Sequence, residues 1–322
     1  KLEKRHPGFP GLNLTFETLE SIRKHTIRED LPLEEEYRPE WSPLMEGQVV
    51  DIADSIAYDA HDIDDSIKGA RWVEKHLLPR YDQILTISCY SMSNLKQSVP
   101  EISDRVDYIY CGVRAQSAVL DTNDNSWRNK LGISEDVPVF ISSGVLTPRK
   151  NYNFLLDIMD KWSKMGRNGI LIITGEGKLR DQLERKVDEM DLVEKVRLVG
   201  YQSETDLVRM FTSSIAFLSP SKMEGFGLAV AEAMACGTPA IVSNKGALPE
   251  VVSHHKTGFV LPINQGPDPW ISAMISLSDD SALYKSYGEA AESRIKDIFT
   301  WERAGTETEA IYQQVVDQYH HR

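Results

Sequence analysis

Two glutamates, Glu224 and Glu232, lie eight residues apart around a glycine-containing turn. A short apolar run, residues 215–218, precedes them and predicts a strand, and an Ala- and Met-rich segment after Gly227 predicts a helix. Glycines leave backbone N–H groups uncovered at a helix N-terminus, where a phosphate binds well. Because eight residues are roughly two helical turns, both carboxylates can face one ligand that extends from a phosphate to a hydroxyl-rich group.

The full stretch, E-G-F-G-L-x3-E-A-M-A-x-G-T-P-x-I, resembles the E-x7-E signature of retaining, nucleotide-sugar-dependent glycosyltransferases with the GT-B fold (group 1, family 4 type). The resemblance implies that Glu232 holds the nucleotide ribose and that Glu224 acts on the donor sugar. It also implies that the turn lies near the diphosphate or sugar, through Gly225, Phe226, Gly227 and Leu228. The alternative is an ordinary strand, turn and helix with two exposed glutamates.

A second loop brings two cations, Arg149 and Lys150, to the end of another predicted strand, residues 137–144. In the resembled family the basic residues of this loop, which begins at Gly144, contact the diphosphate. Fixed cations there would stabilise the charge that develops on the leaving group. A solvated Arg–Lys pair in a turn remains the alternative. The segment 175–177, Gly-Glu-Gly, either shapes a base pocket or simply turns the chain.

Strands and helices alternate over residues 126–300, which predicts an α/β domain with a parallel, Rossmann-like sheet. Ligands of such sheets bind at the carboxyl ends of the strands. A final helix is expected within 301–322. The predicted strands are 137–144, 169–175, 196–200, 215–218 and 239–243, and the predicted helices follow Asn151, occupy 178–190, follow Ser203, and fill 269–296 and 301–319.

Residues 71–125 resemble the end of the N-terminal domain of the same glycosyltransferases. A strand leads to Ser88, which is expected to cap a helix that carries Met92 and Leu95, and residues 106–113 predict the next strand. Only the last part of an acceptor-binding domain is expected here, with a hinge around 112–121. Turnover is therefore expected to be impaired.

Residues 1–70 are acidic, with 8 Lys and Arg against 16 Asp and Glu, and are predicted to be helical. Together, H-P-G-F-P-G-L-N-L-T and D-x-I-A-Y resemble HD-domain, dGTPase-like deoxynucleoside triphosphate triphosphohydrolases. That resemblance implies Asp54 as one ligand of a divalent metal. One carboxylate does not hold a catalytic metal, so an acidic, solvated helix face is the alternative. The two resemblances together predict a chimera of two incomplete enzymes.

The composition limits the classes of function for this 322-residue chain. A net charge of −13 argues against a general nucleic-acid binder. Three widely spaced cysteines form no metal pattern and are expected to be reduced, as in a cytoplasmic protein. No apolar run approaches the ~20 residues of a transmembrane helix; peripheral membrane contact stays open. The oligomeric state is not predicted.

The sequence therefore predicts retaining, metal-independent transfer of a sugar, of the hexosyltransferase type, from a UDP-sugar or GDP-sugar to an acceptor that it does not identify. No cofactor is expected. Two alternatives remain: a non-catalytic fusion that binds nucleotide-sugars, and a triphosphohydrolase that depends on Asp54 and a divalent metal.

Overall fold

The computed structural model describes residue 78, residues 81–113 and residues 126–320. The chain divides into two units, Lys1–Arg80 and Tyr81–Arg322. Apart from residue 78, all described residues belong to the second unit. The predictions for residues 1–70, among them the metal ligand Asp54, lie outside the described residues. The same is true of most of the expected hinge.

Six parallel strands form the main sheet, in the order β5-β4-β3-β6-β7-β8. This arrangement confirms the predicted α/β fold with a parallel sheet. Five strands correspond to the predicted ones, whereas β8 was not predicted. The strands are β3 (Val139–Ser143), β4 (Ile170–Thr174), β5 (Val196–Gly200), β6 (Ala216–Ser219), β7 (Ala240–Ser243) and β8 (Gly258–Leu261).

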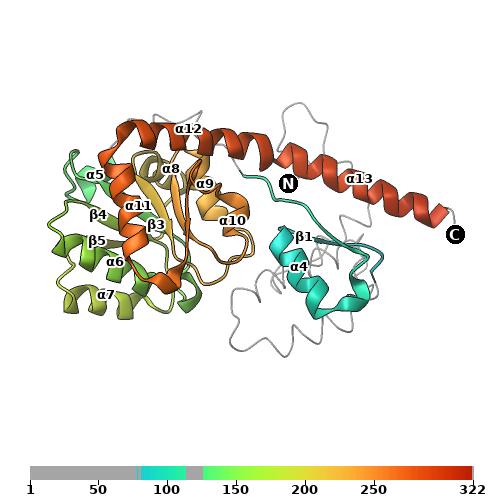
Figure 1. Ribbon diagram of the computed structural model, residues 1–322, viewed down its shortest axis with the longest axis horizontal. Helices are drawn as coiled ribbons and strands as arrows, with labels where there is room; N and C mark the ends of the chain where they lie inside the picture. The colour runs from blue at the N-terminus through green and yellow to red at the C-terminus, as the bar shows by residue number, and fades with distance from the viewer. Residues whose placement is uncertain (1–77, 79–80, 114–125, 321–322) are drawn as a thin grey trace, which may run out of the picture. The chain divides into compact units, whose positions relative to one another are not determined.

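Helices cover both faces of this sheet (Figure 1). Side chains alternate along each strand, so that Ile141 joins one apolar cluster while Phe140 joins the other. The first cluster packs under α5 (Ser126–Lys130), α8 (Glu204–Thr212), α9 (Leu228–Ala235), α10 (Leu248–Val251) and α12 (Ser281–Ile298). The second packs under α6 (Tyr152–Lys164), α7 (Arg180–Glu189) and α11 (Asp268–Asp279).

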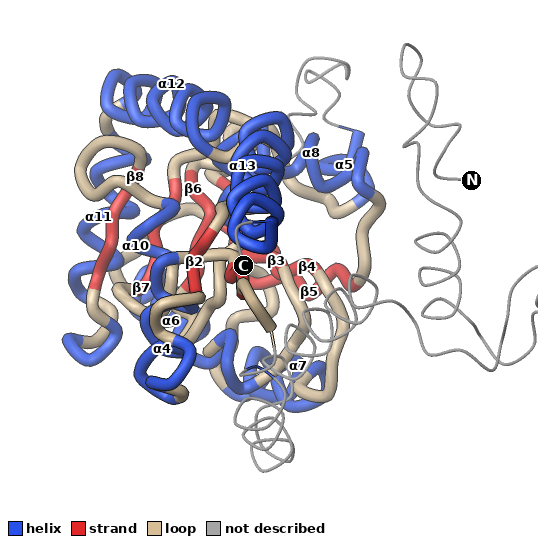
Figure 2. The backbone as a smooth tube through the Cα atoms, turned by 90° about the vertical axis from the view of Figure 1, so that its right-hand side faces the viewer, coloured by secondary structure: helices blue, strands red, loops and turns tan. Residues whose placement is uncertain are grey.

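The strand order reverses direction between β3 and β6, which pair through Phe140 with Ala216 and Ile141 with Phe217. After β3 the chain continues to α6 on one face, and after β6 it continues to α9 on the other. Figure 2 shows the strands between α8 and α12 on one side and α6 and α7 on the other. Open α/β sheets bind their ligands beyond the carboxyl ends of two strands whose connections diverge in this way, a position termed the crevice.

A smaller segment precedes the main sheet, with β1 (Ile84–Thr86) parallel to β2 (Val106–Tyr108) and α4 (Cys89–Ser98) between them. A short 3-10 helix, Pro100–Ile102, follows α4. Ser88 caps α4 by accepting a hydrogen bond from the amide of Ser91, as predicted. The strand β2 ends earlier than predicted, because the chain leaves the small sheet and the amide of Val113 bonds to Phe299.

The last helix, α13 (Trp301–His320), follows α12 after a two-residue break, and the two lie nearly end to end in Figure 1. It confirms the predicted terminal helix. Among the described residues, no helix combines the length and apolar character needed to cross a membrane.

Candidate functional site

The loop after β3 is shaped to hold its two cations against the neighbouring loop. A 3-10 turn, Pro148–Lys150, follows the strand, and Asn151 takes a left-handed backbone conformation with φ of 59° before α6 begins. Asn151 tolerates this conformation better than most residues. Its side-chain amide donates to the carbonyl of Pro220 at 3.2 Å, and the Arg149 carbonyl accepts from the amide of Lys222 at 2.8 Å. The loops after β3 and β6 are therefore joined at the crevice.

Three charged side chains meet where these two loops touch. Oε2 of Glu224 lies 2.7 Å from Nη1 of Arg149, and Oε1 lies 2.8 Å from Nζ of Lys150. Nη1 of Arg149 also donates to the Met223 carbonyl at 2.7 Å. The carboxylate is 8% exposed, and the two cations are 13% and 17% exposed. One negative and two positive charges leave this cluster with an excess positive charge at the crevice.

The protonation of Glu224 follows from two opposing effects. Burial favours the neutral acid and alone would raise the pKa of this carboxyl. The charges of Lys150 and Arg149 oppose burial and prevail, so that the pKa of Glu224 lies below its usual value. Glu224 is therefore a carboxylate over the whole neutral range.

Glycines on two sides let the charged cluster pack closely. A Cβ at Gly246 would lie 2.3 Å from the carbonyl oxygen of Glu224, and that carbonyl accepts from the amide of Ala247 at 2.9 Å. A Cβ at Gly144 would lie 3.0 Å from Cε of Lys150. Gly144 also accepts a hydrogen bond from the hydroxyl of Tyr152 at 3.0 Å. The predicted residue Gly144 thus lies beside Lys150.

The turn from Gly225 to Leu228 opens α9. Gly227 has φ of 101°, which favours glycine, and its carbonyl accepts the amides of the first helical turn. Leu228 is half exposed, but the ring of Phe226 is buried against Tyr110 and Phe299. The ring of Phe226 is therefore part of the core and does not line the outer side of the turn.

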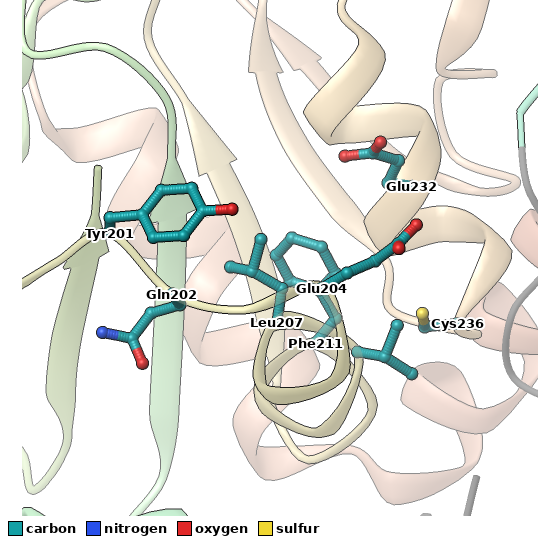
Figure 3. A pocket seen from close by; sticks show the side chains of 8 residues that line it. Tyr201, Gln202, Glu204, Leu207, Phe211, Glu232 and Cys236 are labelled. Atoms are coloured by element: carbon teal, nitrogen blue, oxygen red, sulfur yellow. The ribbon is translucent and has the colours of Figure 1, made fainter. Parts of the chain in front are cut away.

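Glu232 lies apart from the charged cluster, on the wall of a depression of about 130 Å³. Figure 3 shows Tyr201 and Glu232 on two sides of this depression, with Leu207 and Phe211 between them. Its lining, as the described residues form it, includes neither Glu224 nor the two cations. The remaining lining residues are Gln202, Glu204, Val208 and Cys236.

Two residues that line this depression, Tyr201 and Gln202, were not predicted from the sequence. Both directly follow β5, so their place beyond the carboxyl end of a strand was the signal that could have found them. The segment 175–177 packs closely on the loop after β3, because Cβ atoms at Gly175 and Gly177 would lie 2.2 Å from Gly144 and 2.6 Å from Leu146, respectively. Whether it also shapes a base pocket stays a prediction. In the part of the chain that the structure describes, no group of three His, Cys, Asp or Glu could hold a metal ion.

The sequence is similar to those of known proteins. An uncharacterized glycosyltransferase of Methanocaldococcus jannaschii is 28% identical over 71% of this chain and 59% of its own. A GDP-mannose-dependent monoacylated alpha-(1-6)-phosphatidylinositol monomannoside mannosyltransferase of Corynebacterium glutamicum is 25% identical over 77% of this chain and 66% of its own. The chain thus spans less than two thirds of the length of these relatives.

Among solved structures, Alr3699/HepE of Anabaena in complex with UDP aligns with a TM-score of 0.70 at 17% identity, covering 85% of this chain and 78% of its own. This likeness shows the fold. The family of glycosyl transferases group 1 matches residues 123–294, more than half of the sequence. The chain belongs to the glycosyl transferases group 1 family.

Proposed function

We propose that this chain forms the donor-binding part of a retaining glycosyltransferase that uses a nucleotide-sugar. The observation that carries the proposal is the cluster of Arg149, Lys150 and Glu224 at the point where the connections of β3 and β6 diverge. A nucleoside diphosphate is an anion, and its charge is opposite in sign to the net charge of this cluster. Two cations held at 2.7 and 2.8 Å from one carboxylate are fixed before the ligand arrives.

In the proposed reaction, the bond between the sugar and the diphosphate breaks and negative charge grows on the leaving diphosphate. Arg149 and Lys150 stabilise that charge, together with the amides at the start of α9. Fixed protein cations supply the positive charge that a divalent metal brings to a diphosphate in other enzymes. The proposal therefore includes a metal-independent reaction.

Glu224 has two roles in this proposal. It orients the two cations, and it also accepts hydrogen bonds from donor-sugar hydroxyls, since two carboxylate oxygens offer about four acceptor sites. Glu232 binds the ribose hydroxyls in the neighbouring depression, with Tyr201 and Gln202 near the base. Similar proteins use either guanine or uracil nucleotides: the Corynebacterium protein is GDP-mannose-dependent, and the Anabaena protein was solved with UDP. Hence the donor is proposed as a UDP-sugar or a GDP-sugar.

The test is titration calorimetry with UDP and GDP, followed by hydrolysis of UDP-glucose and GDP-mannose in the presence and absence of EDTA. We expect one nucleotide to bind, Arg149→Ala to weaken its binding about tenfold or more, and hydrolysis to withstand EDTA. Arg167→Ala is the matched control. Arg167 lies before the amino end of β4 and pairs with Asp279 at the surface, whereas Arg149 follows the carboxyl end of β3.

A wild-type chain that binds neither nucleotide would refute the proposal. Where hydrolysis occurs, the anomeric form of the released sugar, observed by NMR immediately after cleavage, tests retention. The chimera and the triphosphohydrolase alternative depend on residues 1–70, including Asp54, and stay predictions.

A further inference from the structure

Glu250 makes three hydrogen bonds to a part of the chain about 140 to 160 residues away. Its Oε2 accepts from the amide of Cys89 at 2.9 Å, and its Oε1 accepts from the amide of Tyr90 at 2.7 Å. The hydroxyl of Tyr110 donates to Oε2 at 3.0 Å. One carboxylate from α10 thereby binds α4 and the strand end that follows β2.

The two amides are the first of α4, and they have no partner within their own helix. Ser88 satisfies the amide of Ser91, so this helix start needs two further acceptors. Glu250 supplies both of them with a negative charge at the positive end of the helix dipole. A local side chain would cap the helix as well, but it would not connect α4 to the main sheet.

Glu250 is itself fixed from behind by α12. Arg294 donates to the carbonyl of Glu250 at 2.7 Å and to the carbonyl of Val251 at 2.8 Å. Its guanidinium also lies over the ring of Phe299, 5.7 Å from the centroid. The carboxylate is therefore presented from a short helix whose last carbonyls are held in place.

The segment held by Glu250 contacts the turn that opens α9. The ring of Tyr110 lies 6.2 Å from that of Phe226, and both rings contact Phe299 at 5.1 and 5.5 Å. The hydroxyl of Ser91, in the first turn of α4, lies 3.4 Å from the carbonyl of Gly225. Tyr110 thus binds Glu250 through its hydroxyl and packs on the turn through its ring.

We propose that Glu250 is a positioning residue for the donor-binding turn Gly225–Leu228. It holds α4 and Tyr110 in place, and these in turn fix Gly225 and Phe226 so that the turn amides face the diphosphate. This role rests on the proposed function, because it assigns the turn to donor binding. Glu250 touches no substrate in this scheme.

The test compares Glu250→Gln with Asp280→Ala. Glutamine keeps the shape of Glu250, but its NH2 group faces an N–H or O–H donor and cannot accept a hydrogen bond from it. Asp280 also caps a helix start, since it accepts from the amide of Leu283. This bond is local to α12 and does not connect α4 to the main sheet. The first readout is the hydrolysis of UDP-glucose and GDP-mannose. The second is hydrogen exchange of the amides of Cys89, Tyr90 and Val230, the last of which donates to the carbonyl of Gly227 in the turn.

We expect Glu250→Gln to lower kcat about tenfold to a hundredfold, as misplaced groups do, with less than a threefold change in KM. The three amides should exchange faster. Asp280→Ala should leave kcat and this exchange unchanged although it destabilises the fold. Wild-type kcat in Glu250→Gln, or unchanged exchange at Val230, would overturn the proposal.

Failure of the proposed function gives a different result. In that case the wild-type chain binds no nucleotide and hydrolyses no donor, and exchange alone tests Glu250. Faster exchange at Val230 in Glu250→Gln, but not in Asp280→Ala, would then support the positioning role. Equal exchange in the two variants would overturn it.

Discussion

The ammonium nitrogen of Lys150 lies 2.8 Å from Oε1 of Glu224, and this contact joins the loop after β3 to the loop after β6. The carboxylate that receives it is also bound by Arg149. Burying an ion pair costs desolvation energy that its attraction barely offsets, so such a cluster adds little net stability. Its value is geometric: it fixes two cations at the crevice, ready for an anion.

Glu224→Ala should strongly destabilise the protein. The variant leaves two neighbouring cations, each less than one fifth exposed, without their counter-charge. Removing one partner of a buried pair costs about 3–5 kcal/mol in the free energy of unfolding. Urea denaturation at pH 7 measures this loss. Asp160→Ala is the control, since its partner Lys164 is 74% exposed, and its loss should stay below about 1 kcal/mol.

Acidification should remove the contribution of Glu224 to stability. Its pKa in the folded state is lower than in the unfolded chain, where it is about 4.3. The stabilising effect is therefore complete above that unfolded value and is lost as the pH falls through the lower folded value. Urea unfolding of the wild type and Glu224→Gln from pH 7 to pH 3 checks this sign. A stability difference that stays constant down to pH 3 would contradict it.

The strands of the main sheet could be predicted only in part from the sequence. Long apolar runs bounded by glycine or proline located β3 to β7. Ser88 was recognised as a helix cap, and a helix was expected after Ser203, which caps it. The strand β8 was missed, because Gly258–Leu261 is four residues long and its pairing with β7 comes from tertiary contact.

The candidate site was predicted unevenly for a similar reason. The motif around Glu224 and the Arg149–Lys150 pair are local patterns, and the structure brings these three residues together. That Glu224 would bind the two cations directly depends on the approach of two loops about 75 residues apart. The bond from Glu250 to Tyr90, across 160 residues, had no local pattern at all.

Gly246→Ala should disturb Glu224 from the opposite side. The new Cβ would lie 2.3 Å from the carbonyl oxygen of Glu224, and φ at Gly246 is +61°. Gly132→Ala is a matched control, since φ there is +66° and no atom lies within 4 Å. Both variants carry the backbone strain of about 1–3 kcal/mol. Only Gly246→Ala adds a clash, so its midpoint in urea should be clearly lower. Equal midpoints would show that the loop yields without cost.

Two probes should separate the charged cluster from the depression at Glu232. Pyrophosphate carries the diphosphate alone, whereas UDP or GDP adds the ribose and base. Lys150→Ala should weaken both probes about tenfold, because a hydrogen bond to a charged group contributes about 1.5–3 kcal/mol. Glu232→Gln should weaken only the nucleotide, since Glu232 lines the depression and Lys150 does not.

Calorimetry with both variants measures these affinities. Glu204→Gln is the control, because Glu204 lines the same depression from α8 and has no proposed contact with the ribose. Loss of pyrophosphate binding in Glu232→Gln would mean that the two groups of residues act as one pocket. Unchanged nucleotide binding in that variant would contradict the proposed contact between Glu232 and the ribose hydroxyls.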